Sequence, residues 1–290
     1  MDTGLNFRTK KGQEDYFKAY DETLALWTLP YAEVYVDTAY GKTHVIICGK
    51  RDLKPLVLLH AASCGATIWY PNVRELSKEY CVYAVDLITE SSKSILMKKI
   101  RSPRESAGWL NDVFDKLNIN HISLCGLSIG GWNATNYASC YPERVEKLIL
   151  LSPVQTLSKM YPTFFFKIMR MGFHPTRENV EKYIGWSGAQ EPPLPDSVIR
   201  QFTLSVMNVN SNSVFPKWLK SSRLNALKMP VMVLLGQREF TFSVQKALTR
   251  ARKEINTLQI EVIDHASHLL NISAPDTVNQ KTLEFLRAKP

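Results

Sequence analysis

The sequence predicts an α/β fold built around a mostly parallel sheet. Helix-like periodicity separates several short apolar runs, and alternation of strand and helix is typical of a doubly wound sheet. Runs that are apolar throughout suit strands buried on both faces. Two further strands precede these runs, so we expect eight strands flanked by helices. The apolar runs cover residues 56–60, 81–86, 121–128, 147–152, 231–236 and 260–264.

The chain opens with a predicted helix and a predicted hairpin. Residues 13–28 carry apolar side chains at roughly helical spacing, and Pro30 ends the pattern. Residues 33–49 alternate apolar and polar side chains around a glycine-containing turn, which predicts two antiparallel strands. Farther along, residues 103–117 and 273–288 show the periodicity of helices that cover a sheet.

One long interval interrupts the alternation of strand and helix. We expect residues 154–228 to form a helical cap inserted in an α/β core that comprises residues 1–153 and 229–290. Within it, residues 161–173 combine aromatic, methionine and basic side chains. This pattern is compatible with a helix on a membrane surface or with a lid whose apolar face packs on the core. We favour the lid, because the neighbouring segments are not notably basic.

The composition excludes several classes of protein. Of 290 residues 45% are apolar and 22% charged, as in ordinary globular proteins, and no run approaches the about 18 to 20 apolar residues that cross a bilayer. We therefore expect no stable membrane insertion and, without a signal-peptide pattern, a cytoplasmic location. The formal charge of +9 comes from scattered lysines and arginines, which favours a solvated basic surface over a nucleic-acid site. The five cysteines lack C-x-x-C spacing and are expected to be reduced and structural.

A candidate nucleophile lies between a predicted strand and a predicted helix. Gly126-Leu127-Ser128-Ile129-Gly130 matches the G-x-S-x-G pattern. There, small residues on both sides permit a sharp turn that aims the serine off the sheet edge, and the helix N-terminus favours developing negative charge. Glycines that merely allow close helix packing are the alternative. A serine hydroxyl needs a base and an orienting acid, so the choice depends on residues elsewhere.

His268 is the best candidate base. It follows the last predicted strand by a short loop, and loops at the carboxyl ends of strands are where α/β sheets place their sites. His60 also ends a strand, but in the loop expected to form an oxyanion hole. His265 suggests a metal pair with His268, yet no third ligand clusters with them. The histidines that do not follow a core strand are His44, His121 and His174.

Glu239 is the candidate orienting carboxylate. Where serine, acid and histidine follow one another in the chain, the acid comes after the penultimate strand, and Glu239 stands three residues past Gly236. Asp264 and Asp86 are the competing carboxylates, the first close to His268 in sequence and the second at a strand end.

Two backbone N–H groups are candidates for an oxyanion hole. One belongs to Ile129, the residue after the candidate nucleophile. The other belongs to Ala62, in the loop that follows residues 56–60. The candidate nucleophile, base, acid and oxyanion hole then all follow the expected strands in the expected chain order. This joint agreement is a far more specific signal than any one motif.

With these residues assigned, the sequence resembles the α/β-hydrolase superfamily, and within it the bacillar carboxylesterases of the naproxen-esterase type. The likeness runs through "LVLLHAASCGATIWYPNV", "GLSIGGWN", "PVMVLLGQREF" and "EVIDHASHLLNISAPDTVN". It implies ester hydrolysis under a helical cap, without a metal or an organic cofactor, and with a glutamate as the acid. Ala61 and Ser267 stand where the family usually has glycine.

We therefore expect a serine carboxylesterase whose catalytic residues are Ser128, His268 and Glu239 and whose reaction passes through an acyl-enzyme. The expected substrate is a small ester with a hydrophobic or aryl acyl group. The same triad could hydrolyse a lactone, a thioester or a carbon–carbon bond, because a fold does not determine a substrate. A sensor that binds a hydrophobic ligand, with incidental hydrolysis, is the alternative from another class. No nucleic-acid partner is expected.

Overall fold

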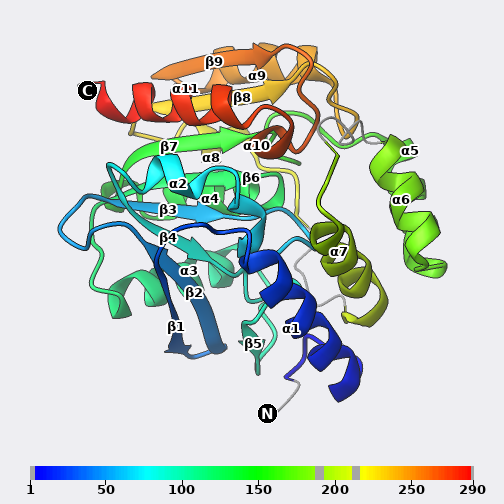
Figure 1. Cartoon of the computed structure of the whole chain (residues 1–290). Coiled ribbons are helices and arrows are strands. Elements are labelled where there is room, and N and C mark those ends of the chain that lie inside the picture. Colours follow the sequence, from blue (N-terminus) through cyan, green and yellow to red (C-terminus); the bar gives the residue numbers. More distant parts are fainter. Residues whose placement is uncertain (1–3, 187–192, 211–215, 289–290) are drawn as a thin grey trace.

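A single mostly parallel sheet organises the molecule (Figure 1). The computed structural model describes residues 4–186, 193–210 and 216–288. Eight strands follow the order β1-β2-β4-β3-β6-β7-β8-β9, antiparallel as far as β4 and parallel from β4 to β9, which confirms the predicted sheet. The strands are β1 (Tyr31–Thr38), β2 (Gly41–Cys48), β3 (Pro55–Leu59), β4 (Cys81–Val85), β5 (Ile95–Leu96), β6 (Ile122–Leu127), β7 (Val145–Leu151), β8 (Val231–Gly236) and β9 (Leu258–Ile263).

Two local features differ from the prediction. The ninth strand, β5, has two residues paired with β2 and is too short to produce a periodic pattern. The first helix covers Lys10–Leu24 instead of residues 13–28, because the Thr9 side chain accepts the Gly12 N–H and caps the helix three residues earlier. Beyond Leu24, i to i−3 hydrogen bonds tighten the chain into a turn.

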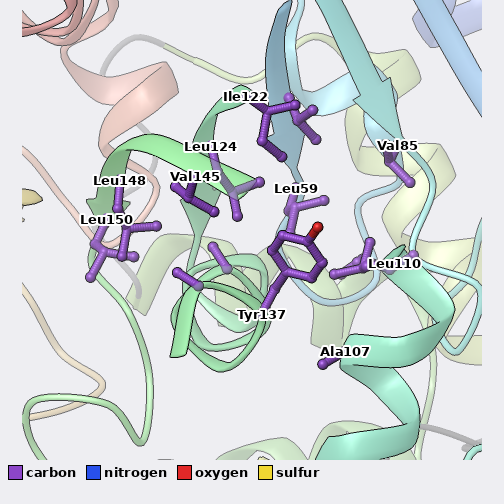
Figure 2. Packing of buried hydrophobic residues seen from close by; sticks show 14 of the residues in the cluster. Leu59, Val85, Ala107, Leu110, Ile122, Leu124, Tyr137, Val145, Leu148 and Leu150 are labelled. Carbon is purple, nitrogen blue, oxygen red and sulfur yellow. The ribbon is translucent and has the colours of Figure 1, made fainter. Parts of the chain in front are cut away.

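Helices cover both faces of the sheet, so the core has two layers. On one face α3, α4, α8 and α9 pack on Val57, Leu59 and their neighbours, a cluster seen in Figure 2. On the other face α1, α2, α10 and α11 pack on Leu56 and Leu58. Successive residues of one strand point to opposite faces. Both sets of side chains are therefore buried, which explains why the strand sequences are apolar throughout.

The helices are consistent with the predicted alternation. The helix predicted over 103–117 and the C-terminal helix predicted over 273–288 both form, with ends shifted by one or two residues. Among the other helices of the described residues, α2, α8 and α10 are turns of four residues, whereas α4, α5, α6, α7 and α9 have 10 to 13 residues. In order, the helices are α1 (Lys10–Leu24), α2 (Val73–Leu76), α3 (Pro103–Lys116), α4 (Ile129–Cys140), α5 (Pro162–Phe173), α6 (Arg177–Trp186), α7 (Asp196–Asn208), α8 (Ser221–Leu224), α9 (Val244–Glu254), α10 (Leu270–Ser273) and α11 (Pro275–Arg287), with 3-10 turns η1 (Ala66–Trp69) and η2 (Pro142–Arg144).

The segment between β7 and β8 contains α5 to α8. In Figure 1, α5, α6 and α7 lie to one side of the sheet, with α7 beside α1. The N-terminal residues join this group, since Phe7 forms a β-bridge with Val209 and α1 packs along α7. Residues 187–192 and 211–215, part of the predicted 154–228 insertion, lie outside the described residues. No helix in the described ranges combines the length and apolarity needed to cross a membrane.

Candidate active site

Ser128 occupies a strained turn between β6 and α4. Its φ of 55° and ψ of −114° fall in a region that residues with a side chain rarely adopt. Glycine is required on both sides. A Cβ on Gly130 would lie 2.1 Å from the Leu59 carbonyl oxygen, and one on Gly126 would lie 2.3 Å from the Gly130 carbonyl oxygen. The G-x-S-x-G pattern thus meets a steric need of the backbone.

The structure brings the three candidate side chains into one hydrogen-bonded chain. Ser128 Oγ lies 2.9 Å from Nε2 of His268. On the other side of the ring, Nδ1 lies 2.7 Å and 2.9 Å from the two carboxylate oxygens of Glu239. A neutral ring that donates its Nδ1–H to Glu239 leaves Nε2 free to accept the Ser128 proton. The arrangement can therefore activate the hydroxyl.

The Glu239 carboxylate stays ionised although it is buried. Burial alone would raise the pKa of Glu239, but the His268 ring and the Thr241 N–H, 2.8 Å from Oε1, lower it below its ordinary value. The side chain is 0% exposed. Rings of Phe240 and Phe242 contact His268 edge-on, with centroids 5.5 Å and 6.4 Å away. Carboxylate and rings together fix the orientation of the imidazole.

Ala62 and Ile129, the two residues with candidate oxyanion N–H groups, are at the cavity beside Ser128. Ile129 is the first residue of α4, so its N–H has no partner within the helix. Ala62, Ser63 and Ile129 line the same cavity as Ser128. This cavity can therefore present both candidate oxyanion donors to a bound carbonyl oxygen.

A buried polar network supports the Ala62 loop. Nε2 of His60 accepts the Leu87 N–H at 2.9 Å, so Nδ1 carries the proton and donates to the Ala61 carbonyl at 2.7 Å. Burial lowers the pKa of His60, in keeping with this neutral form. Asp86 accepts the Ala66 N–H at 2.7 Å and contacts His44 at 2.9 Å. Asp86, a competing acid on sequence grounds, thus braces the loop while Glu239 contacts the base.

Replacing Asp86 with alanine should destabilise the fold. The variant leaves the buried Ala66 N–H without a partner and removes one of the two carboxylates that contact the buried His44 ring, so we expect a loss of about 3 to 5 kcal/mol in the free energy of unfolding. Urea denaturation measures it. Asp264→Ala is the matched control, because Asp264 is exposed and should change stability by less than about 0.5 kcal/mol. Equal losses in the two variants would contradict the bracing role.

Other residues singled out in the sequence lie away from the hydrogen-bonded chain. Asp264 and His265 are exposed, and the His265 N–H is held by Gln237. Ala61 and Ser267, at the two positions where the family usually has glycine, are both buried. All five cysteines are free thiols, and all but Cys140 are buried, as expected.

The cavity beside Ser128 has an apolar wall and a polar wall. Its volume is about 380 Å³. Both α5 and the loop before it contribute to the apolar wall, so the helix in the segment predicted as a lid lines this cavity. The polar wall includes Thr89, Glu90 and Ser91, which follow β4. The apolar residues of the lining are Ile129, Val154, Met160, Phe164, Phe165, Ile168, Met171, Val206, Val209 and Pro216.

Aromatic contacts join the α5–α6 region to the loop that carries Glu239. The Phe240 ring lies 4.7 Å from that of Trp186 and 5.8 Å from that of Phe164, centroid to centroid. In addition, the Tyr161 N–H donates to the Thr241 carbonyl at 2.8 Å. The loop that carries Glu239 therefore also anchors the start of α5.

Glu90 is a cavity residue that the sequence did not single out. It is 7% exposed, and its Oε1 has no hydrogen-bond partner among the described residues. Burial raises the pKa of Glu90 to about 7, and the Ser63 N–H offsets only part of that rise. The carboxyl therefore changes charge near neutral pH, next to the Ala62 loop. Nothing in a single sequence distinguishes it from a surface glutamate.

Glu90 should make stability depend on pH in a predictable direction. A carboxyl with a raised pKa binds its proton more tightly in the folded state than in the unfolded state. Its contribution to the free energy of unfolding is therefore present below about pH 4.5 and is lost as pH rises through about 7. We expect Glu90→Gln to remove this loss, which is at most roughly 3 kcal/mol at about 1.4 kcal/mol per pKa unit. Denaturation of both proteins at pH 5 and pH 8 measures it. Parallel pH profiles would contradict the prediction.

Comparisons with known proteins give the family. Residues 56–281 match the family model described as "Alpha/beta hydrolase family". The chain belongs to the α/β-hydrolase family. A carboxylesterase named nap from Bacillus subtilis, described as uncharacterized, is 34% identical over 94% of this chain and 93% of its own length. Carboxylesterase YbfK from the same organism is 32% identical over 93% of each chain.

Solved structures of α/β hydrolases agree with this assignment. Naproxen esterase from Bacillus subtilis superimposes with a TM-score of 0.90 at 32% identity, over 97% of this chain and 100% of the other. Carboxylesterase CesB (YbfK) superimposes with a TM-score of 0.91 at 30% identity, over 97% and 100%. The resemblance noted in the sequence is confirmed along nearly the whole chain.

Proposed function

We propose that the protein is a serine carboxylesterase with Ser128 as nucleophile, His268 as general base and acid, and Glu239 as the orienting carboxylate. The hydrogen-bonded chain from Glu239 through His268 to Ser128, at the base of a cavity, carries the proposal. The relatives named as carboxylesterases support ester hydrolysis as the reaction.

In the proposed reaction, His268 Nε2 takes the Ser128 proton as Oγ attacks the ester carbonyl carbon. The carbonyl oxygen becomes an oxyanion, which the N–H groups of Ala62 and Ile129 would stabilise. Collapse of this intermediate breaks the ester bond, and His268 gives its proton to the departing alcohol. Water then attacks the acyl-enzyme with His268 again as base, which releases the acid and restores Ser128.

We further propose that the preferred substrate has a hydrophobic or aryl acyl group. The apolar wall supplied by Val154, Met160 and Phe164 can desolvate such a group beside the nucleophile. Only part of a 380 Å³ cavity would be filled by an acetyl group. Longer or aromatic acyl chains gain from burial, at about 25 cal/mol per Å² of apolar surface.

Two measurements test the function. A fluorophosphonate probe should label the protein, and peptide mapping should find the label on Ser128. A panel of p-nitrophenyl esters should be hydrolysed, with kcat/KM rising at least tenfold from acetate to octanoate or a 2-arylpropionate. A lactone, an acyl thioester and a vinylogous 1,5-diketone complete the panel.

The outcomes separate the alternatives left open by the sequence. Turnover of the diketone in preference to every ester would identify a carbon–carbon bond hydrolase instead. Turnover of no compound, together with tight binding of a hydrophobic ester, would favour the sensor. A label on a residue other than Ser128 would overturn the proposed nucleophile.

A further inference from the structure

Helix α5 exposes an apolar face that packs on nothing in the described molecule. In an α-helix, residues three, four and seven apart share a face. Phe164 and Met171 lie on the buried face. Phe166, Met169 and Phe173 lie on the opposite face and are 71%, 44% and 73% exposed. In the sequence, a lid and a membrane-surface helix are alternatives for this segment. In the structure, the helix has one buried face, as a lid requires, and one exposed apolar face, as a membrane-surface helix requires.

The exposed large apolar side chains of this protein concentrate here. A scattered exposed leucine or phenylalanine is ordinary, whereas a contiguous apolar patch marks an interaction surface. Phe166, Met169 and Phe173 define what we call the α5 outer face. Elsewhere the exposed large apolar side chains are spread over several elements. They are Tyr31, Tyr35, Met97, Trp186 and Met207.

The charged side chains on α5 itself are all positive, and the carboxylates Glu178 and Glu181 of the neighbouring α6 pair with Lys182 and Arg177. Between residues 159 and 177 the sequence has four lysines and arginines and no carboxylate. Lys167 and Arg170 flank the outer face on α5 and line a groove of about 240 Å³ shared with α6. Lys167 Nζ lies 3.1 Å from the centroid of the Trp186 ring. Arg170 has no carboxylate partner among the described residues, so it can bind an external anion.

We propose that the α5 outer face binds reversibly to the surface of a bilayer that contains anionic lipids. Phe166, Met169 and Phe173 would enter the boundary between headgroups and acyl chains, while Lys167 and Arg170 contact lipid phosphates. The formal charge of +9 adds a general attraction to an anionic surface. This binding does not depend on the proposed esterase activity.

The chemistry of the surface favours this occupant over others. A second copy bound through the same face would bring Lys167 and Arg170 of each molecule close to those of the other, while the nearby carboxylates Glu178 and Glu181 already pair with Lys182 and Arg177. Nucleic acid would gain little from three apolar side chains without hydrogen-bonding groups. A bilayer that contains anionic lipids has charged headgroups for Lys167 and Arg170 and, just beneath them, acyl chains for the apolar side chains of the α5 outer face.

The orientation also has a geometric consequence. Phe165 and Ile168, on the flank of α5 between the two faces, line the cavity that contains Ser128. A molecule docked through the α5 outer face would hold this cavity close to the lipid surface. The lid helix would then serve both as a wall of the cavity and as a lipid contact.

Vesicle sedimentation tests the proposal on the full-length protein. We expect wild-type protein to pellet with equimolar phosphatidylcholine and phosphatidylglycerol vesicles at least tenfold more tightly than with phosphatidylcholine alone. The double variant Phe166→Ser/Phe173→Ser should weaken binding to anionic vesicles at least tenfold, as expected from the roughly 25 cal/mol per Å² gained by burying two phenylalanines. Met97→Ser, which removes an exposed side chain outside the helix, should bind like the wild type.

A charge-matched pair isolates the electrostatic part. Lys167→Gln/Arg170→Gln should weaken binding to anionic vesicles roughly 25-fold, since each cation near an anionic surface contributes about 1 kcal/mol. Lys246→Gln/Lys253→Gln lowers the net charge equally, but at exposed positions on α9, and should have a smaller effect. Unchanged unfolding midpoints establish that the variants fold.

Three results would overturn the proposal. The first is failure of the wild-type protein to pellet with anionic vesicles. The second is binding by Phe166→Ser/Phe173→Ser as tight as that of the wild type. The third is a wild-type dimer in solution that this double variant dissociates, since a second copy would then cover the face.

Discussion

Ser128→Ala should lower kcat for ester hydrolysis by about 10⁴-fold or more while leaving the fold intact. The substitution removes the oxygen that attacks the carbonyl, so no acyl-enzyme can form, and only the oxyanion donors and substrate binding remain. Alanine keeps the Cβ that the φ of 55° already accommodates in serine. Steady-state hydrolysis of a p-nitrophenyl ester measures the effect.

The matched control for this variant is Ser123→Ala. Ser123 lies on the same strand, β6, and is also buried, but it is outside the hydrogen-bonded chain. We expect its kcat to stay within about twofold of the wild type. Ester hydrolysis that survives Ser128→Ala at the wild-type rate would refute a serine mechanism at this site.

Glu239→Gln should lower kcat by about 10³- to 10⁴-fold, nearly as much as loss of the nucleophile. A glutamine amide can donate to Nδ1 of His268, which favours the tautomer with its proton on Nε2, and that nitrogen then cannot accept the Ser128 proton. The carboxylate that balances the imidazolium charge is also lost. Because the His268 ring and the Thr241 N–H keep Glu239 ionised in spite of its burial, the effect should persist across neutral pH.

Two further variants make the Glu239 result decisive. Glu239→Asp keeps the charge on a shorter side chain and should recover part of the activity, which a purely structural role in the loop would not predict. Asp264→Asn changes the exposed carboxylate that is closer to His268 in sequence, and it should retain activity within about twofold. If Asp264→Asn abolished turnover and Glu239→Gln did not, the acid would be misassigned.

Much of the fold could be predicted because its signals are local. Each of the six apolar runs is a strand, with its ends shifted by at most two residues, and all but β9 are largely buried on both faces, whereas β9 at the sheet edge alternates between partly buried and exposed residues. The failures occurred where the signal was weak. The two residues of β5 form no pattern of their own, and the start of α1 depends on one cap by Thr9.

The candidate site could be predicted only as a set of positions. Chain order and strand ends selected Ser128, Glu239 and His268, because parallel strands bring their carboxyl ends to one edge. The sequence left Asp86 as a competing acid. Only the three-dimensional structure shows which carboxylate contacts His268: Glu239 does, while Asp86 contacts His44 and His60.

By itself, therefore, the sequence determined the α/β architecture, the strained turn at Ser128 and the chemical types of the residues around it. The tertiary structure alone decided which side chains share a cavity, how burial raises the pKa of Glu90 to about 7, and which face of α5 is exposed. The physical reason is that periodicity and chain order arise from neighbours along the chain. Burial and charge contacts arise from residues that folding brings together from distant positions.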